Sequence, residues 1–278
     1  PYLNHCAVKG TCDDLPSVPN CTLQRCDTER DVLLAWTDLI QKEDPDIVIG
    51  YNIFGFDYNF MYARAQELGC VKEFLKLSRN KKEVCLSYNW KTRKQGLQES
   101  TVFLASGEHQ LSFPNMPGRL QIDMYNFLRR DYQLTQYKLD YVASQFIGDK
   151  VTGVDHEHGR TRVQSGNLTG LTEHSFISFE EEAHSVDAYK DGKKFEVLEI
   201  DRSSGVFWIA GEECPDMTKK VRWGLAKDDV TPQDIFRMTR EGPGPRSTIA
   251  KYCIQDCNLV QHLLRKIDVL TGYIEMAG

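Results

Sequence analysis

The chain has 278 residues, of which 41% are hydrophobic and 27% are charged, and its formal net charge is −6. These values are typical of a globular protein with one large domain or two small ones. A negative net charge argues against a protein that coats nucleic acid through a broad positive field. No stretch approaches the ~20 apolar residues of a membrane-spanning helix, so we expect no membrane partner.

Nine cysteines lie between Cys6 and Cys257 without a CxxC pair, which indicates neither a disulfide framework nor a zinc ribbon. The spacing of Cys6/Cys12 and Cys21/Cys26 leaves a metal site open, but ordinary thiols are favoured. We therefore expect an intracellular, reducing compartment. Because residues 1–5 contain neither an initiator Met nor a targeting segment, we expect a piece of a longer protein.

The first predicted helix begins near Thr28, where Thr28-x-x-Asp31 matches a capping box. An apolar stripe at helical spacing follows, formed by Val32, Ala35, Trp36, Leu39 and Ile40. Asp44-Pro45-Asp46 should end this helix. The run Ile47-Val48-Ile49 then predicts a short strand that is buried on both faces of a sheet.

A second helix is expected from about Tyr58, with Gly69 as its stop. A strand between two helices indicates an α/β layer fold, in which ligands gather at the carboxyl ends of strands. Residues 52–57 are therefore expected at a site.

Residues 72–94 contain eight basic and two acidic side chains, a net charge of 8 − 2 = +6. Strand-like patterns at residues 84–90 and 101–104 predict one hairpin with a polar, basic tip around Lys94-Gln95-Gly96. Basic residues interleaved with aromatic ones suit a surface that follows phosphates and stacks bases. A solvated helix end and loop is an equally good interpretation of this composition.

Further along the chain, a strand is expected at residues 120–124 and a helix at residues 139–147. Residues 171–217 carry four basic and twelve acidic side chains, a net charge of 4 − 12 = −8, with strand-like runs at residues 195–198 and 205–209. We expect an inserted, acidic, strand-rich lobe at about residues 156–222, whose charge would repel DNA and favours a protein contact or a spacer role.

The last helix is expected from Ser247 or Thr248 to about Leu270. Tyr252 and Asp256 lie four residues apart and therefore share one face of it. Carboxylates from separate elements are the usual ligands of the two divalent ions that hydrolyse phosphodiesters, and a nearby Tyr hydroxyl can orient the attacking water. Each residue also has a structural explanation, since Asp57 could cap a helix and Asp256 could lie on a solvated helix face.

The motifs around these residues resemble those of family B DNA polymerases. Residues 44–58 (DPDIVIGYNIFGFDY) are similar to the second exonuclease motif of the family, and residues 252–257 (YCIQDC) are similar to the third. Residues 118–124 and 137–142 resemble segments of delta-type members, and residues 272–277 are similar to the family's exit from this domain. Residues 223–230 and the acidic insertion look most like polymerases of large double-stranded DNA viruses, such as algal and giant viruses. The resemblance covers residues 24–150 and 222–278.

This resemblance implies an RNase H-like 3′→5′ proofreading exonuclease domain, with a mixed sheet, flanking helices and two Mg²⁺ or Mn²⁺ ions in the intact domain. Asp57 and Asp256 would be metal ligands, and Tyr252 would position the catalytic water. DNA, as the single-stranded primer 3′ end and the primer-template, would be the partner. The residues expected to contact it are Asn52, Phe56, Tyr88, Trp90, Lys91, Arg93 and Lys94. The hairpin at about residues 88–101 lies where the family has a strand-separating hairpin.

The first motif of the family, a D-x-E on the opening strand, does not occur before Asp57. We therefore expect residues 1–278 to be a partial domain without its first strands, and to be inactive alone. The parent would be a DNA polymerase in the nucleus or a cytoplasmic virus factory of a host cell, with a sliding clamp as a further partner. The alternatives are a stand-alone exonuclease with the same DEDDy-type ligands, and a non-catalytic RNase H-like module that only binds DNA or protein.

Overall fold

The computed structural model describes residues 1–80, 82–90, 93–104, 107–226 and 230–277. The chain divides into two compact units, one formed by residues 1–133 and 230–260 and the other by residues 134–229 and 261–278. None of the helices in the described ranges is both long and apolar enough to cross a membrane.

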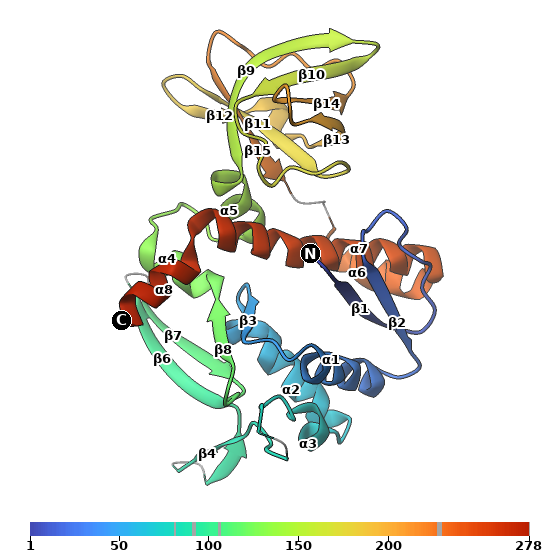
Figure 1. Cartoon of the computed structure of the whole chain (residues 1–278), viewed down its shortest axis with the longest axis vertical. Helices are drawn as coiled ribbons and strands as arrows, with labels where there is room; N and C mark the ends of the chain where they lie inside the picture. The colour runs from blue at the N-terminus through green and yellow to red at the C-terminus, as the bar shows by residue number, and fades with distance from the viewer. Residues whose placement is uncertain (81, 91–92, 105–106, 227–229, 278) are drawn as a thin grey trace. The chain divides into compact units, whose positions relative to one another are not determined.

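The first unit is a mixed α/β structure (Figure 1). Its strands are β1 (Asn4–Lys9), β2 (Cys21–Cys26), β3 (Ile47–Gly50), β4 (Ser87–Asn89), β5 (Lys94–Gly96), β6 (Gln98–Leu104), β7 (Gly107–Phe113) and β8 (Leu120–Asp123). Its helices are α1 (Glu29–Glu43), the π-helix η1 (Ile53–Asp57), α2 (Tyr58–Glu67), α3 (Val71–Phe74), α4 (Met124–Asp131), α6 (Pro232–Glu241) and most of α7 (Pro243–Ile267).

Local signals set the ends of the first helices. Thr28 and Asp31 form the predicted capping box of α1, and Asp44 ends this helix in a left-handed conformation (φ 45°). Gly69 follows α2 at φ 66°, a conformation that glycine adopts without strain. The predicted first and second helices are thus confirmed. The last long helix begins at Pro243, before the predicted Ser247, because proline is tolerated in the first turn of a helix.

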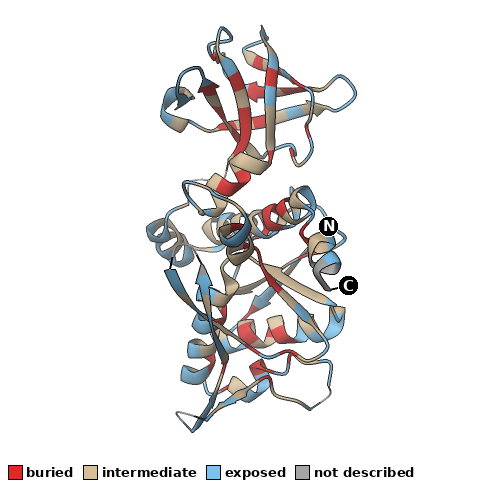
Figure 2. Ribbon diagram, turned by 90° about the vertical axis from the view of Figure 1, so that its left-hand side faces the viewer, coloured by how far each residue is buried: buried red, intermediate tan, exposed pale blue. Residues whose placement is uncertain are grey.

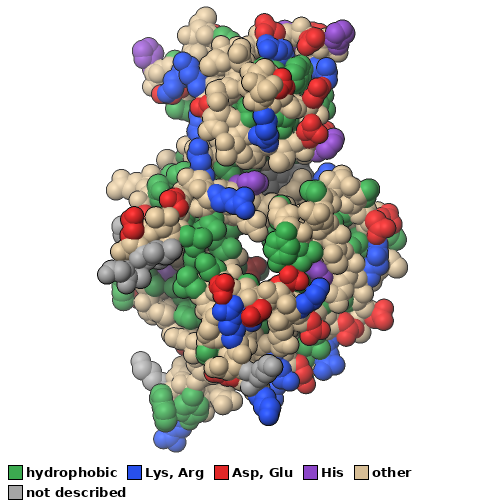
Figure 3. Space-filling model, viewed as in Figure 1, with side chains coloured by type: hydrophobic (Ala, Val, Ile, Leu, Met, Phe, Trp, Pro, Cys, Tyr) green, Lys and Arg blue, Asp and Glu red, His purple; other side chains and the backbone are tan. Residues whose placement is uncertain are grey.

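Two separate parallel pairs of strands take the place of one continuous sheet. β1 pairs with β2, and β3 pairs with β8. The space-filling view shows an opening through this unit, between the part with β3 and the part with β1 and β2, with apolar side chains along its rim (Figure 3). The prediction that Ile47-Val48-Ile49 is buried on both faces is wrong, because all residues of β3 are only half-buried. In the described parts of the chain, β8 is the one strand that pairs with β3.

The predicted single hairpin is in fact two hairpins. β4 pairs with β5 as a short hairpin, and β6 pairs with β7 over seven residues as a second one. The strand at residues 101–104 therefore has β7 as its partner, not residues 84–90. β7 has a polar sequence, GEHQLSF, whose weak alternation gave no strand signal.

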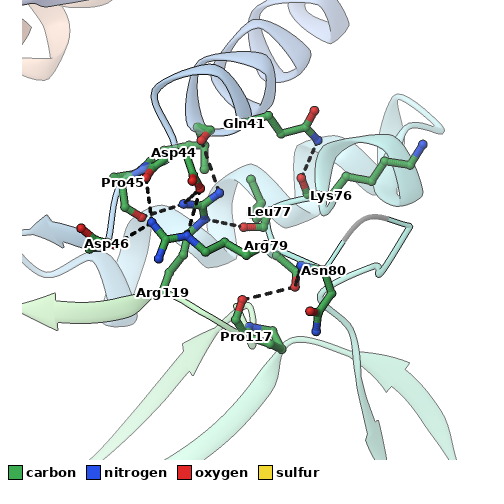
Figure 4. A network of polar contacts seen from close by, with 12 residues as sticks. Gln41, Asp44, Pro45, Asp46, Lys76, Leu77, Arg79, Asn80, Pro117 and Arg119 are labelled. Carbon is green, nitrogen blue, oxygen red and sulfur yellow. Dashed lines mark hydrogen bonds and ion pairs between the residues drawn. The ribbon is translucent and has the colours of Figure 1, made fainter.

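A buried arginine joins the elements around the start of β3 and β8 (Figure 4). The Arg119 side chain is 2% exposed and donates to the carbonyl oxygens of Leu77 (2.9 Å) and Pro45 (2.6 Å) and to Asp44 Oδ1 (2.8 Å). Arg79 Nε donates to the same Asp44 oxygen (3.0 Å). A planar guanidinium with five donors suits such a convergence of acceptors. This cluster fixes the entry of both strands that lead to residues 50–57.

The main apolar core of the first unit lies between α1, α2 and α3, where buried side chains gather (Figure 2). It contains Leu33, Tyr58, Ala65, Cys70, Phe74, Leu75, Leu77, Cys85, Leu97 and Met116. A smaller core joins β1 and β2 to α7 through Cys12, Leu15, Ala250 and Ile254. The larger core thus fixes α1, α2 and α3, and the smaller core fixes α7.

The second unit is built on a closed antiparallel barrel. Its strands are β9 (Gly148–Glu157), β10 (Arg160–Ser165), β11 (Phe176–Glu182), β12 (Val186–Ala188), β13 (Phe195–Asp201), β14 (Val206–Ala210) and β15 (Lys220–Ala226). The unit also contains α5 (Leu139–Phe146), the 3₁₀ turn η2 (Tyr189–Gly192) and α8 (Val269–Ala277). The strand order is β11-β13-β14-β10-β9-β15, and β11 also pairs with β15, so the six strands close into a ring.

Alternating apolar side chains fill this barrel. The buried residues include Val151, Val163, Ile177, Phe179, Phe195, Val197, Phe207, Ile209, Val221 and Trp223. Trp223 Nε1 donates to Ser165 Oγ at 2.9 Å, which satisfies the one polar group of the indole. The predicted strands near residues 195–198 and 205–209 are confirmed as β13 and β14. The region rich in strands runs from residue 148 to residue 226.

Candidate nuclease site

The carboxyl ends of β3 and β8 lie side by side, because Gly50 is the register partner of Asp123. After Gly50 the chain turns sharply. Asn52 adopts a left-handed conformation (φ 61°), and η1 begins directly after it. Gly55 lets the turn pack closely, since a Cβ atom at this position would lie 2.4 Å from Asn52 Oδ1 and would force the Asn52 side chain to move. The turn delivers Asp57 to the start of α2.

Asp57 does not cap a helix. It occupies the N-cap position of α2 with helical dihedral angles (φ −62°, ψ −46°), and its side chain makes no capping hydrogen bond. Burial and the neighbouring charge of Asp123 raise the pKa of the half-buried Asp57 carboxyl, although its own backbone N–H acts in the opposite direction. The interpretation of Asp57 as a helix cap is therefore wrong. A carboxylate held in this way gains most from a cation.

The second carboxylate comes from α7. Tyr252 and Asp256 are both half-buried and lie one turn apart on this helix, as the sequence predicted. Cys257, the next residue of this helix, is influenced by both carboxylates. Desolvation by the surrounding protein and the charges of Asp256 and Asp57 raise the pKa of its thiol. The carboxylates of Asp57 and Asp256, which are 199 positions apart in the sequence, thus both act electrostatically on one thiol.

Two carboxylates provide part of the ligand set of a two-metal site. Oxygen ligands from separate elements suit Mg²⁺ or Mn²⁺. In the part of the chain that the structure describes, no group of three or more His, Cys, Asp or Glu side chains is arranged to hold a metal ion. Asp57 and Asp256 therefore fit such a site by their chemistry and require further ligands to complete it.

Asp123 is a third carboxylate at this edge, and no role was predicted for it. Its side chain is 4% exposed. Burial raises the pKa of Asp123, while hydrogen bonds from Phe54, Asn52, Tyr125 and Asn126 lower it. Its position at the end of a strand parallel to β3 was the only available signal, because its partners on the turn are about 70 positions away.

Exposed aromatic rings lie beside Asp57. Phe56 is 61% exposed and Phe60 is 55% exposed, although both are large apolar side chains. Their rings are nearly parallel, with centroids 5.9 Å apart and planes inclined by 10°. Phe56 was predicted as a DNA contact, whereas Phe60 was missed because its spacing of four from Phe56 resembles an ordinary helix face.

The β4–β5 hairpin carries the other predicted DNA contacts. Trp90 is 83% exposed and packs edge-on against Tyr88, with centroids 4.8 Å apart. Arg93 and Lys94 are exposed on the same hairpin. Lys91 lies outside the described residues. The hairpin therefore presents aromatic and basic groups together. The side chain of Asn52, the remaining predicted DNA contact, lies against Gly55 within the turn.

Comparison with known proteins places this site in a family. The model of the exonuclease domain of family B DNA polymerases matches residues 2–142, which include β1 through α4 and Asp57. The chain belongs to the family B DNA polymerases, and its residues 2–142 match their RNase H-like α/β exonuclease domain.

Among individual proteins, the DNA polymerase of Phaeocystis pouchetii virus is 44% identical over 287 residues, which cover 100% of this chain and 28% of that polymerase. The DNA polymerase of Pyramimonas orientalis virus is 37% identical, over 96% of this chain and 20% of that protein. The delta catalytic subunit of Oryza sativa subsp. japonica is 33% identical over 56% of this chain and 13% of that subunit. The predicted resemblances to viral and delta-type polymerases are thus confirmed. The chain spans less than a third of each of these relatives.

Proposed function

We propose that this chain is the 3′→5′ proofreading exonuclease region of a DNA-directed DNA polymerase that acts in DNA replication. The observation that carries the proposal is that the charges of Asp57 and Asp256 both act on the thiol of Cys257, in a chain that belongs to the family B polymerases. Asp57 lies on a strand-to-helix turn and Asp256 on a long helix, so two rigid supports hold the carboxylates.

The substrate is the unpaired 3′ end of a DNA primer, and the reaction is hydrolysis of its terminal phosphodiester. Asp57 and Asp256 would hold Mg²⁺ or Mn²⁺, and such ions would supply activation of the water and neutralisation of the leaving oxyanion. Tyr252, one turn from Asp256, orients the attacking water through its hydroxyl. Phe56 and the exposed groups of the β4–β5 hairpin hold the single strand by stacking and charge.

The remaining ligands come from a D-x-E strand that precedes this chain in the parent polymerase. The opening between the β1–β2 pair and the β3–β8 pair supports this assignment, since β3 lacks a second neighbour among the described residues (Figure 3). A strand in this opening would join the two pairs into one mixed sheet. It would also place its carboxylates at the edge where Asp57 lies.

Metal binding tests this assignment directly. In a longer chain that includes the preceding residues, Mn²⁺ titration should reveal two sites, and residues 1–278 alone should degrade single-stranded DNA little or not at all. Robust Mg²⁺-dependent degradation by residues 1–278 would contradict it. If the preceding sequence lacks D-x-E, a non-catalytic binding module becomes the better explanation.

The parent is proposed to work in the nucleus or a cytoplasmic virus factory, with a sliding clamp engaged through its other domains. A polymerase carboxylate motif downstream of residue 278 distinguishes this parent from a stand-alone exonuclease. The match of viral polymerases along nearly the whole chain favours the polymerase.

A further inference from the structure

We propose that Asp123 is a positioning residue for the exonuclease reaction, which fixes the turn that carries Asp57. The inference rests on the proposed exonuclease function. It assigns the task of holding the turn to a residue that does not touch the metal or the DNA.

The two oxygens of Asp123 join two segments of the chain. Oδ1 accepts hydrogen bonds from the backbone N–H of Asn52 (2.7 Å) and of Tyr125 (3.0 Å). Oδ2 accepts from the backbone N–H of Phe54 (3.0 Å) and from Asn126 Nδ2 (3.1 Å). Each oxygen therefore binds one donor on the turn after β3 and one donor on α4.

These four bonds use the acceptor capacity of the carboxylate. An ionised carboxyl has about four lone-pair positions. With four N–H groups around it and 4% exposure, Asp123 has no free direction for a metal ion. The Asp57 side chain, by contrast, makes no hydrogen bond that caps α2.

The turn depends on this support. Asn52 is in a left-handed conformation that a residue with a side chain rarely adopts, and its carbonyl oxygen accepts from the N–H groups of Gly55 (3.1 Å) and Phe56 (3.0 Å). Asp123 thus holds Asn52, Asn52 begins η1, and Asp57 is the last residue of η1. A shift of the turn would move the Asp57 carboxylate directly.

Substitution by asparagine separates this role from capping of α4. Asn and Asp are equally good N-cap residues, so the bond from Tyr125 survives in Asp123→Asn. The new amide group, however, replaces Oδ2 and faces two donors, Phe54 N–H and Asn126 Nδ2. The variant therefore loses a hydrogen bond to the turn while the start of α4 is retained.

The experiment uses the polymerase that contains this chain, with single-turnover digestion of a single-stranded DNA 3′ end at increasing Mn²⁺. Asp123→Asn should lower the exonuclease rate about 10- to 100-fold and raise the half-saturating Mn²⁺ concentration. Nucleotide addition and the melting temperature should stay close to wild type. Asn126→Ala, which removes only an α4 donor, should change the rate about twofold or less.

Three results would overturn the inference. In the first, Asp123→Asn keeps the wild-type exonuclease rate and Mn²⁺ dependence. In the second, Asp123→Asn loses exonuclease activity and nucleotide addition together and its melting temperature falls. In the third, Asn126→Ala lowers the exonuclease rate as much as Asp123→Asn does. Asp57→Ala serves as the reference. If Asp57→Ala also leaves digestion intact, the proposed exonuclease function fails; if it abolishes digestion while Asp123→Asn does not, only the positioning role fails.

Discussion

Acidic side chains are used in opposite ways in the barrel and at the end of β3. In the barrel, Glu213 lies 2.6 Å from Lys190 Nζ, Glu181 lies 3.0 Å from Lys219 Nζ, and Glu182 lies 2.5 Å from Lys220 Nζ. At the end of β3, Asp57 has the like charge of Asp123 as its neighbour. Part of the acidic excess in the sequence between 171 and 217 is therefore compensated by ion pairs, two of them with lysines that lie outside this range.

The comparison shows that the number of acidic residues does not identify a site. Paired carboxylates stabilise the fold in which they occur, whereas a carboxylate held near another negative charge costs stability. Such a cost is typical of a functional position. Residues 171–217, the most acidic part of the chain, carry structural charges, and Asp57 and Asp256 carry the proposed chemistry.

The sharpest test of this contrast is the removal of the Asp57 and Asp256 carboxylates. In the parent polymerase, Asp57→Ala or Asp256→Ala should lower exonuclease activity about a thousandfold, equal to ~4 kcal/mol of transition-state stabilisation, and leave nucleotide addition nearly intact. The two rates are measured on the same preparation. Equal loss of both activities would contradict the assignment.

A second test concerns a charge that is structural in the first unit. Arg119→Met removes the donors to the Leu77 and Pro45 carbonyl oxygens and to the Asp44 carboxylate, and should lower the stability of the first unit by about 3 kcal/mol. Hydrogen exchange would show faster opening of β3, β8 and α1, with the barrel unchanged. Arg25→Met, at an exposed ion pair, is the matched control and should leave exchange unaltered. If the two variants change hydrogen exchange equally, the buried arginine has no special role in stability.

The third test addresses the barrel. Burial by itself would raise the pKa of Glu213, but Lys190, Lys193 and the Tyr189 hydroxyl bring it below its ordinary value of 4.5. The unfolded chain then binds the proton more readily, so this carboxylate stabilises the barrel above pH ~4.5 and loses its effect as the pH falls through the lower folded pKa. Glu213→Gln should cost about 2 kcal/mol at pH 7.

Thermal unfolding of both proteins between pH 7 and pH 3 provides the check. The difference in melting temperature between wild type and Glu213→Gln should shrink toward acid pH. Exonuclease activity of the parent at pH 7 should be unchanged. A difference that is constant with pH would mean that the ion pairs of Glu213 contribute nothing.

The smallest effect is expected at the exposed aromatic pair. Phe60→Ala should raise KM for a single-stranded 3′ end about fivefold, or ~1 kcal/mol, because stacking of one base on the ring pair is weakened. Phe236→Ala, which removes an equally exposed ring from α6, should have no effect. If both variants behave alike, the Phe56–Phe60 pair is not a base platform.

Much of the local structure could be predicted from the sequence. The capping box of α1, the stop at Gly69 and the one-turn spacing of Tyr252 and Asp256 involve residues within a few positions of each other. Such signals persist in any fold. They were sufficient to place Asp57 on a strand-to-helix turn and Asp256 on a helix.

The features that could not be predicted depend on distant partners. Barrel closure requires Phe176 to pair with Ala226, and the turn before Asp57 requires a carboxylate 71 positions after Asn52. Nothing in the neighbouring residues encodes these contacts. The role of Asp57 itself was ambiguous for the opposite reason, because its position next to a helix favoured a cap until the dihedral angles excluded it.

The pairing of β9 with β15 has a consequence for how such a chain can change. The chain enters the barrel at Gly148 and leaves it beside the same point, since Gly224 is the register partner of Gly148. The points at which the chain enters and leaves the barrel are therefore only one strand spacing apart, about 4.8 Å. A short turn could bridge this distance. The barrel can therefore be lost, exchanged or enlarged without a change in the path of the remaining chain.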